Sequence, residues 1–415
     1  MQRTGVALVL LTVAVAACAG PREPWKSPAA LPVIGMDWAT VPDVERPSDT
    51  IASAQPSQLP HGSDTAGHPG HPAGQAHLQA VARGGPGLVA VGHVVPGVRA
   101  AAWTSVDGLA WRRVPDFPVA NDSPPLAVAA GPGGTPVVAV GTENGLPLAL
   151  VTDDGATWQK PPFVVDDPRE PIQVAAVAAG AGGFAAGGWA GASNERPDTR
   201  IWYSADGFDW QPSTIAPTSE DGRILSIASG PTGYVAVGQT GPEGSPTGSA
   251  IWTSPNGRTW ARLADRRLPG PATLEAVTAT AGGYVAIGST IDRDEAVAWL
   301  SPDGMSWTAA SDGSALGAHG PKVRMRAVVT GGSAGPGLVA VGSSLFGTQF
   351  GTAAVWLSPD GRSWQRVPDV PAFDGAEMNG VVAIDQGGGQ PRIIAVGTWG
   401  APDQYVPTVW ISPPS

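Results

Sequence analysis

The sequence predicts an all-β fold, and three features of the chain lead to this prediction. Of its 415 residues, 57 are glycine and 43 are proline, while only 14% are charged. Short runs rich in Val, Ile and Trp alternate with turn-forming residues, and no long stretch carries apolar residues at helical spacing. Two sequence motifs also recur along most of the chain. Many short strands joined by tight turns account for all three features.

The first recurring motif is a turn with the pattern Ser/Thr-x-Asp/Asn-Gly-x-x-Trp. It occupies residues 105–111, 152–158, 204–210, 254–260, 301–307 and 358–364. The second motif is an apolar run, such as Leu-Val-Ala-Val, that ends in a glycine. These glycines lie 47 to 55 residues apart, at Gly92, Gly141, Gly188, Gly238, Gly288, Gly342 and Gly397. A shorter apolar run precedes each of them, so each repeat carries the signals of four strands, which we call A to D.

A recurring four-stranded unit of about fifty residues is typical of a β-propeller blade. Seven A–B pairs therefore predict a seven-bladed β-propeller of four-stranded antiparallel blades within residues 77–415. The Asp-Gly dipeptide predicts a two-residue hairpin between strands C and D, because such hairpins favour residues with positive φ. The A–B and C–D turns must then share one face of the ring, and the B–C and D–A connections must share the other.

The seventh blade lacks a D strand of its own. Its C strand lies in residues 409–415, where the sequence ends as the turn begins. Residues 35–43, GMDWATVPD, match residues 108–116, GLAWRRVPD, in the first blade. We therefore expect residues 33–50 to supply the missing strand and close the ring, with residues 51–76 as a linker to the first blade. Closure removes an open sheet edge that would otherwise favour aggregation.

Tryptophan placement follows the same repeat. Thirteen of the 16 tryptophans occupy C or D positions, and only Trp25, Trp189 and Trp399 lie outside them. Burial of large aromatic side chains contributes strongly to a core. The repeat tryptophans are therefore expected to pack between blades.

The N-terminus has the pattern of an export signal. Arg3 precedes an apolar segment, residues 5–17, that is too short to span a bilayer. The segment ends in Val-Ala-Ala-Cys, which resembles the lipobox of bacterial lipoproteins. That resemblance implies a signal peptide at residues 1–17, acylation of Cys18, a tether at residues 18–32 and an extracytoplasmic, membrane-anchored protein. An ordinary cleaved signal with an incidental cysteine is the alternative. Cys18 is the only cysteine, so no disulfide is expected.

The repeated turn resembles the Asp-box, or BNR, repeat of sialidase-like propellers, whose pattern is Ser-x-Asp-x-Gly-x-Thr-Trp. The turn here is one residue shorter, since Asp and Gly are adjacent. In that family the repeat is a folding device, which implies that these turns are scaffold. A sialidase would also need an arginine trio, a Tyr–Glu pair and an Asp acid, but the usual Arg-Ile-Pro signature is absent. Tyr203, Tyr234 and Tyr284 fall in predicted strands, and only Tyr405 falls in a predicted loop.

The strongest candidate for a ligand site is the polar end of the A strands, which should line the central channel. One register of these strands holds Gln79, Leu126, Ala175, Leu225, Glu275, Arg326 and Asn379. Its polar members come from neighbouring blades, and Arg324, Glu377 and His77 lie two residues earlier on the same strands. We expect Arg326 to anchor a polar ligand and Glu275 to orient it. A ring of ion pairs that satisfy one another, with no ligand, is the alternative.

Two other regions carry polar residues. Charged loops of blades 2 to 5, at residues 166–171, 194–200, 219–223 and 292–295, suit either plain solvation or a protein partner. His61, His68 and His71, together with His77, could bind a transition metal, although a Pro- and Gly-rich linker loses entropy on ordering. The net charge of −11 disfavours nucleic acid. We expect a monomer without cofactor that binds a protein or glycan, with a glycoside hydrolase that uses two loop carboxylates as the alternative.

Overall fold

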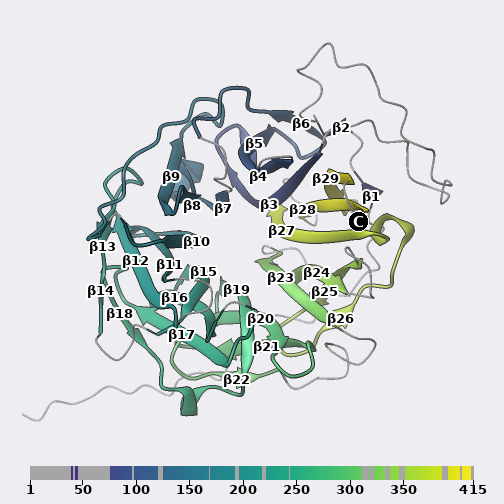
Figure 1. The fold of residues 1–415 in the computed structure, drawn as a ribbon. Coiled ribbons are helices and arrows are strands. Elements are labelled where there is room, and N and C mark those ends of the chain that lie inside the picture. The colour runs from purple at the N-terminus through teal and green to yellow at the C-terminus, as the bar shows by residue number, and fades with distance from the viewer. Residues whose placement is uncertain are drawn as a thin grey trace, which may run out of the picture.

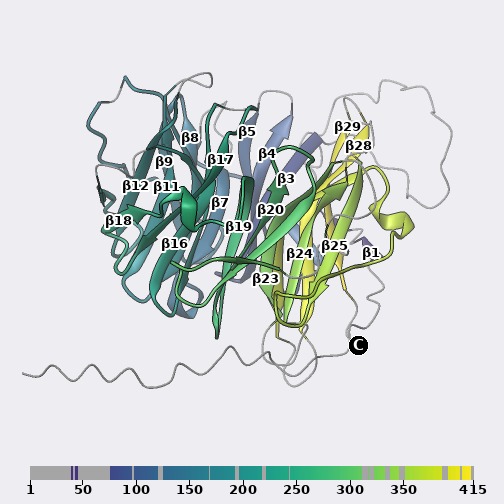
Figure 2. The same ribbon diagram turned by 90° about the horizontal axis from the view of Figure 1, so that it is seen from below.

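The computed structural model confirms a seven-bladed β-propeller, in which seven antiparallel sheets surround a central axis (Figure 1). The structure describes residues 39–40, 43–44, 75–95, 98–119, 125–167, 169–191, 196–216, 221–242, 244–310, 316, 322–331, 337–344, 351–385, 391–401 and 404–412. Figure 2 shows the ring from the side, with the strands running between its two faces.

The innermost strand of each blade is the predicted A strand. These strands are β3 (Gln75–Gly84), β7 (Pro125–Ala130), β10 (Ile172–Gly180), β15 (Arg223–Gly230), β19 (Ala272–Thr280), β23 (Val323–Thr330) and β27 (Ala376–Ile384). The B strands follow as β4 (Gly87–Val95), β8 (Val137–Glu143), β11 (Gly183–Ala190), β16 (Gly233–Thr240), β20 (Gly283–Thr290), β24 (Leu338–Ser344) and β28 (Arg392–Ala401). Each A strand packs beside those of the neighbouring blades, so that the seven line the channel.

The outer half of each blade holds strands C and D. The C strands are β5 (Arg99–Ser105), β9 (Leu146–Thr152), β12 (Asp198–Ser204), β17 (Gly248–Ser254), β21 (Ala296–Ser301), β25 (Thr352–Ser358) and β29 (Gln404–Ile411). The D strands are short: β6 (Ala110–Arg113), β13 (Gln211–Pro212), β18 (Thr259–Arg262), β22 (Thr308–Ala309), β26 (Gln365–Arg366) and, from the N-terminal segment, β1 (Ala39–Thr40). Blade 2 has only a bridge, Val151 to Gln159, in the D position.

Strand β1 pairs antiparallel with β29, the last C strand. Thr40 lies opposite Trp410 and Ala39 lies opposite Ile411. The register matches that within blade 1, where Arg113 lies opposite Trp103. Each of these partners stands two positions after the tryptophan of its motif, Trp38 or Trp111. The N-terminal segment therefore occupies the position of a D strand, and its contribution to stability stays a prediction.

Two further short strands connect neighbouring blades. β2 (Asp43–Val44) pairs in parallel with β6 of blade 1, and β14 (Thr214–Ile215) pairs in parallel with β18 of blade 4. In each case the chain that leaves one D position extends the sheet of the next blade. The outer rim is thus joined by backbone hydrogen bonds as well as by side-chain packing.

Tryptophans of the repeat are buried, as predicted. The twelve that the structure describes are all at most 7% exposed: Trp103, Trp111, Trp158, Trp202, Trp210, Trp252, Trp260, Trp299, Trp307, Trp356, Trp364 and Trp410. They pack with Val, Ile and Ala from adjacent A and B strands in separate clusters between blades. The core is therefore a ring of repeated interblade contacts.

The Asp-Gly turns are wider than a two-residue hairpin, so that prediction is wrong. In blade 5 the last pair before the turn joins Leu300 to Thr308, and seven residues lie between them. Within this turn only the glycine has a positive φ, which is +76° at Gly304. The wider turn allows Trp307 to fold inward and donate its indole N–H to the Gly304 carbonyl oxygen, at 2.9 Å.

Side chains of the motif hold this turn together. The Ser301 hydroxyl accepts the Gly304 N–H at 2.8 Å, and one Asp303 carboxylate oxygen accepts two more backbone N–H groups at 2.8 Å each. The hydroxyl of the Ser or Thr accepts the glycine N–H in all six turns. The Asp or Asn oxygen accepts two backbone N–H groups in blades 2 to 6 and one, from Leu109, in blade 1. At Asp154 the N–H groups of Thr157 and Ala156 lower the carboxyl pKa to about 2. The polar atoms of the motif form hydrogen bonds within the turn itself, which explains why the motif recurs as a folding element.

The Asp-Gly turns and the A–B turns share one face, as predicted. Thr232, in the A–B turn of blade 4, donates its hydroxyl to the Asp303 carbonyl oxygen of blade 5 at 3.2 Å. We call this face the turn face. The opposite face, which carries the B–C and D–A connections, is called the loop face.

Asp303→Ala is expected to lower the free energy of unfolding by about 1 kcal/mol, because two backbone N–H groups lose their acceptor. Asp303→Asn is the matched control, since Asn256 fills this position in blade 4 and accepts the Arg258 and Thr259 N–H groups at 2.9 and 3.1 Å. Urea denaturation compares the two variants. Equal loss in both would contradict the role assigned to the acceptor oxygen.

Candidate functional site

Every A strand contains a β-bulge, and the bulged residue is the one at the predicted polar register. In blade 5, Leu274 lies opposite Gly288 and Ala276 lies opposite Ile287, which leaves Glu275 as the extra residue. The same shift places Gln79, Leu126, Ala175, Leu225, Arg326 and Asn379 at the bulges of the other blades. Bulges bend a strand and redirect its side chains, and they are frequent next to functional sites.

Glycine at the end of each B run permits this bulge. A Cβ atom on Gly288 would lie 1.9 Å from the Thr273 carbonyl oxygen. Equivalent contacts of 1.8 to 2.0 Å occur at Gly92, Gly188, Gly238, Gly342 and Gly397. The recurrent glycine in the sequence is therefore the signal of the bulge, and it explains why A and B strands approach so closely there.

The polar residues predicted at one register of the A strands fall into two separate groups in the structure. In the first part, the Arg326 Nη2 atom lies 3.3 Å from the Glu377 Oε2 atom. The Asn379 amide donates to the Leu78 carbonyl oxygen at 3.0 Å and to the other oxygen of Glu377 at 3.4 Å. Arg326 thus pairs with Glu377 of blade 7, and the expected partnership with Glu275 is replaced. Gln79 occupies the bulge of blade 1 beside this network.

The second part is a pocket of about 480 Å³ on the loop face, between blades 4 and 5 with contributions from blades 3 and 6. Of the predicted site residues, Glu275 and Arg324 line it. Trp189, Arg223, Thr273, Asp294 and Lys322 are among the other lining residues. The pocket therefore combines three cationic side chains with two carboxyl groups. Its size lies within the range of about 300–1,000 Å³ found for small-molecule sites.

Glu275 and Arg324 have opposite charges, but among the described residues neither side chain forms a hydrogen bond or an ion pair. Burial raises the pKa of the Glu275 carboxyl, and the positive charges of Arg326 and Arg324 oppose this rise. A partly buried carboxyl group and a guanidinium that form no hydrogen bond within the described residues are groups that a polar ligand can satisfy.

Arg223 and Trp189 form a part of the pocket wall that the sequence analysis missed. Arg223 is 1% exposed, and its guanidinium carbon lies 4.9 Å from the centre of the Trp189 ring. This contact is a cation–π interaction, which holds the positive charge at the edge of the pocket. Trp189 was one of the three tryptophans outside the repeat, and that departure was the available signal.

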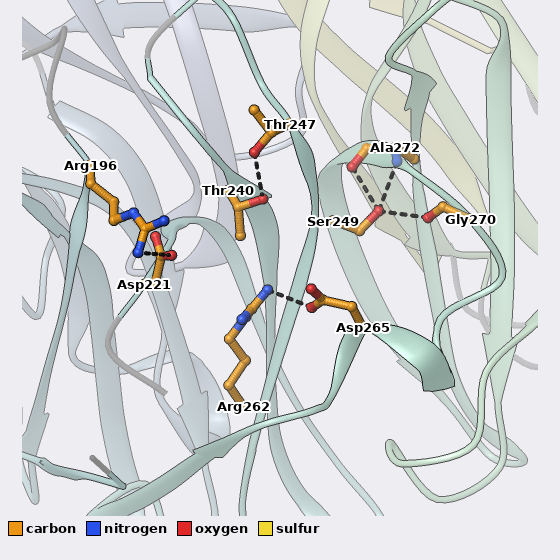
Figure 3. Close-up of polar contacts among 9 residues, drawn as sticks. All are labelled: Arg196, Asp221, Thr240, Thr247, Ser249, Arg262, Asp265, Gly270 and Ala272. Carbon is orange, nitrogen blue, oxygen red and sulfur yellow. Dashed lines mark hydrogen bonds and ion pairs between the residues drawn. The ribbon is translucent and has the colours of Figure 1, made fainter. Parts of the chain in front are cut away.

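Hydrogen bonds fix the segments around the pocket, and Figure 3 shows those of blade 4 and the start of blade 5. The Ser249 hydroxyl of β17 lies 2.8 Å from both the N–H and the carbonyl oxygen of Ala272, where β19 begins. Thr240 and Thr247 join the two ends of a B–C connection at 3.1 Å, and that connection contributes Gly244 and Pro246 to the wall. The pocket is thus held in shape by contacts within the protein.

Connections of blade 5 are fixed in the same way. The Thr273 hydroxyl donates to the Gln239 side-chain oxygen at 2.9 Å, which links blades 4 and 5. The Val323 N–H donates to the Asp294 carbonyl oxygen at 2.7 Å, which links blades 5 and 6. Asp294 has a positive φ of 51°. These bonds position the lining residues from three blades relative to one another.

His77 lies away from this pocket, at the contact between blades 7 and 1. Its ring stacks on His93 at 4.7 Å and contacts Tyr405 at 4.3 Å, while its Nδ1 atom lies 3.1 Å from the Thr398 hydroxyl. Burial lowers the pKa of His77, and burial together with the charge of His77 lowers that of His93 to about 4. Both rings are therefore neutral near pH 7 and serve as packing groups.

The metal hypothesis remains untested for its other members. His61, His68 and His71 lie outside the described residues. Within the described ranges, no three His, Cys, Asp or Glu side chains are grouped so that they could hold a metal ion.

Charged loops on the loop face largely neutralise themselves. Arg200 pairs with Glu170 at 3.0 Å and with Asp198 at 2.5 Å. Arg196 lies 3.6 Å from Asp221. Pairs that remain partly open to solvent, as these do, contribute little to stability, and they favour solvation as the role of these loops.

The four tyrosines bear on the alternative that the protein is a sialidase-like enzyme, because such an enzyme needs a tyrosine in its active site. The Tyr234 and Tyr284 hydroxyls donate to the carbonyl oxygens of Gly183 and Gly233, at 2.8 and 2.9 Å, and Tyr203 donates to that of Gly182. All three contacts lie at A–B turns, on the turn face. Tyr405, expected in a loop, lies in strand β29, because the blade 7 C strand is longer than its apolar pattern indicated. None of the four lines the pocket.

The comparisons with known proteins do not assign the chain to a family. No protein-family model matches the chain, and no curated protein matches its sequence. Among solved structures, the periplasmic gluconolactonase of Pseudomonas aeruginosa has a TM-score of 0.48 at 11% identity, over 82% of this chain and 97% of that one. A putative glycosidase from Bacteroides thetaiotaomicron has a TM-score of 0.35 at 12% identity, over 82% and 87% of the two chains. Similarity at this level says nothing about substrate or activity.

The described part of the chain contains no helix with the length and apolar character needed to cross a bilayer.

Proposed function

We propose that the protein is an exported, lipid-anchored binding protein that holds a polar ligand, such as a glycan, in the pocket between blades 4 and 5. The observation that carries this proposal is the pair of oppositely charged groups, Glu275 and Arg324, which line one pocket and form no hydrogen bond or ion pair among the described residues. Charged groups in a partly desolvated site cost free energy unless they are paired. A ligand with both donors and acceptors would supply that pairing.

The scaffold around the pocket suits binding. Its walls come from four blades whose cores are closed by buried tryptophans and whose connections are hydrogen-bonded to one another. A wall that is already ordered loses little conformational entropy on binding. Trp189 adds an aromatic ring to the lining beside the charged groups, and a mixed aromatic and polar lining suits a sugar.

Arg324→Ala is expected to weaken ligand binding at least about tenfold, a loss of about 1.4 kcal/mol, because a charge-assisted hydrogen bond is removed. Its matched control is Arg362→Ala, which removes an exposed arginine from the turn face of the same blade. A panel of glycans and polar metabolites is screened by thermal shift, and each positive compound is measured by calorimetry on both variants. Equal affinity in the two variants would place the ligand elsewhere.

Anchoring depends on Cys18 in this proposal. With Cys18→Ser, incorporation of labelled fatty acid into the protein should cease, and the precursor should no longer be cleaved before residue 18. Both are followed by gel electrophoresis of cells grown with a clickable palmitate. Normal labelling of the variant would end the lipoprotein proposal and leave the binding site unaffected.

A glycoside hydrolase is the second candidate, favoured by one observation. A carboxyl group with a raised pKa suits a general acid, and Glu275 shares its pocket with a second carboxyl group, Asp294. The binding protein and the glycoside hydrolase predict different results in a hydrolysis assay. An enzyme would release the aglycone from aryl glycosides and lose this activity with Glu275→Gln, whereas a binding protein would retain the intact glycoside.

A further inference from the structure

We propose that the pocket between blades 4 and 5 binds a small anion, a carboxylate or a sulfate-like group, together with one proton that Glu275 carries. This inference rests on the proposed function of the same pocket and specifies its ligand class and its dependence on pH.

The charges that line the pocket favour an anion. Three cationic side chains and two carboxyl groups line the pocket, and Glu275 is the carboxyl group at the bulge of an A strand. Arg324 and Lys322 form no ion pair among the described residues, so both can meet a ligand. Arg223, held against Trp189, adds a fixed positive charge behind them. The excess of cations over anions becomes larger when Glu275 is protonated.

The charged or titratable groups that face Glu275 can be assigned element by element. Strand β15 contributes Arg223. Strand β23 and the residue before it contribute Lys322, Arg324 and Arg326, and the B–C connection of blade 5 contributes Asp294. Strands β16 and β20 contribute uncharged side chains. Arg326 is already paired with Glu377, which leaves Arg324 as the other cation whose charge acts on the Glu275 carboxyl.

Binding of an anion should raise the pKa of the Glu275 carboxyl. In the free pocket, burial raises its pKa while the positive charges of Arg326 and Arg324 lower it. An anion that pairs with Arg324 cancels part of that lowering and adds a negative charge nearby, so the Glu275 pKa rises further in the complex. Protonated Glu275 also supplies an O–H donor for an anionic oxygen. Proton uptake therefore accompanies binding.

The sign of the pH effect follows from this linkage. Affinity for an anion should increase as the pH falls through the Glu275 pKa of the complex, and level off below the Glu275 pKa of the free protein. Both values lie above the ordinary value of 4.5. Because a single proton is taken up, the affinity changes by at most about tenfold for each pH unit in that window.

The experiment measures the affinity of the full mature chain for D-glucuronate by calorimetry, from about pH 5 to about pH 8. The uncharged methyl ester of glucuronate and sodium sulfate are compared under the same conditions, since neither glucuronate nor sulfate titrates in this range. We expect glucuronate or sulfate to bind more tightly at the acidic end, and the ester to show no dependence on pH. Calorimetry in buffers of different ionisation enthalpy should report the proton that is taken up.

Glu275→Gln separates this inference from the function on which it rests. The amide is a neutral isostere of the protonated acid, so this variant should bind the anion with the affinity that the wild type has at low pH, throughout the range. Affinity that is independent of pH in the wild type, or a dependence that persists in Glu275→Gln, overturns proton coupling while binding itself stands. Preference for the ester, or absence of binding by both anions, overturns the anion assignment.

Discussion

Deletion of residues 19–50 is expected to lower the free energy of unfolding by at least about 3 kcal/mol, comparable with the loss of a large core side chain. The deleted segment contains β1, which pairs with the outer edge of β29 at Trp410 and Ile411. Trp410 is fully buried, and its indole N–H donates to the Ala372 carbonyl oxygen at 2.7 Å. Without β1, the ladder on that edge of β29 is lost and the edge is open to other chains.

A chain that lacks only residues 19–32 is the matched control, because it keeps the predicted closing segment. Thermal melting followed by near-UV circular dichroism compares the two truncations, and light scattering reports association through the exposed edge. Melting of the longer truncation at the same temperature as its control would refute the contribution of β1 to closure.

Gly288→Ala is expected to destabilise the protein by about 3 kcal/mol or more and to weaken ligand binding as well, because overpacking against backbone cannot relax through side-chain rotation. The new Cβ atom would lie 1.9 Å from the Thr273 carbonyl oxygen and 3.0 Å from the Leu274 Cα atom. The A strand must therefore move away from the B strand at the bulge that presents Glu275 to the pocket.

Gly270→Ala serves as the control in the same blade, since no atom lies within 4 Å of its added methyl group. Urea denaturation and calorimetric titration of both variants test the prediction. A Gly288→Ala variant with the stability and affinity of the control would show that the bulge tolerates a side chain, contrary to its geometry.

Much of the fold could be read from local patterns. The number of blades followed from seven A–B pairs, and the position of β1 followed from the match between residues 35–43 and 108–116. Both inferences worked because a propeller blade repeats the same contacts, so its sequence signals repeat too. The hairpin was misjudged at Asp303-Gly304, because the dipeptide pattern does not reveal that Trp307 folds back beneath the turn.

Less of the candidate site could be read in this way. The register that contains Glu275 and Arg326 was visible, because it recurs at a fixed distance from the B-run glycine. Its partners were not visible. Arg326 pairs with Glu377 from the next blade, whereas Glu275 shares a pocket with Arg324 and with Arg223, residues that lie about fifty positions away on either side.

The sequence by itself determined the repeated elements of this protein: the strands, the positions of the Asp-Gly turns, the tryptophan core and the register of polar residues that the B-run glycine marks. Each depends on residues that are close in the chain or recur with its period. Only the tertiary structure decided which polar side chains are satisfied and which face a pocket. That outcome depends on contacts between blades, such as the ion pair of Arg326 with Glu377, and on connections such as the one held by Ser249 at Ala272, which no local pattern encodes. Charge pairing acts through space between blades, and therefore follows from packing rather than from sequence spacing.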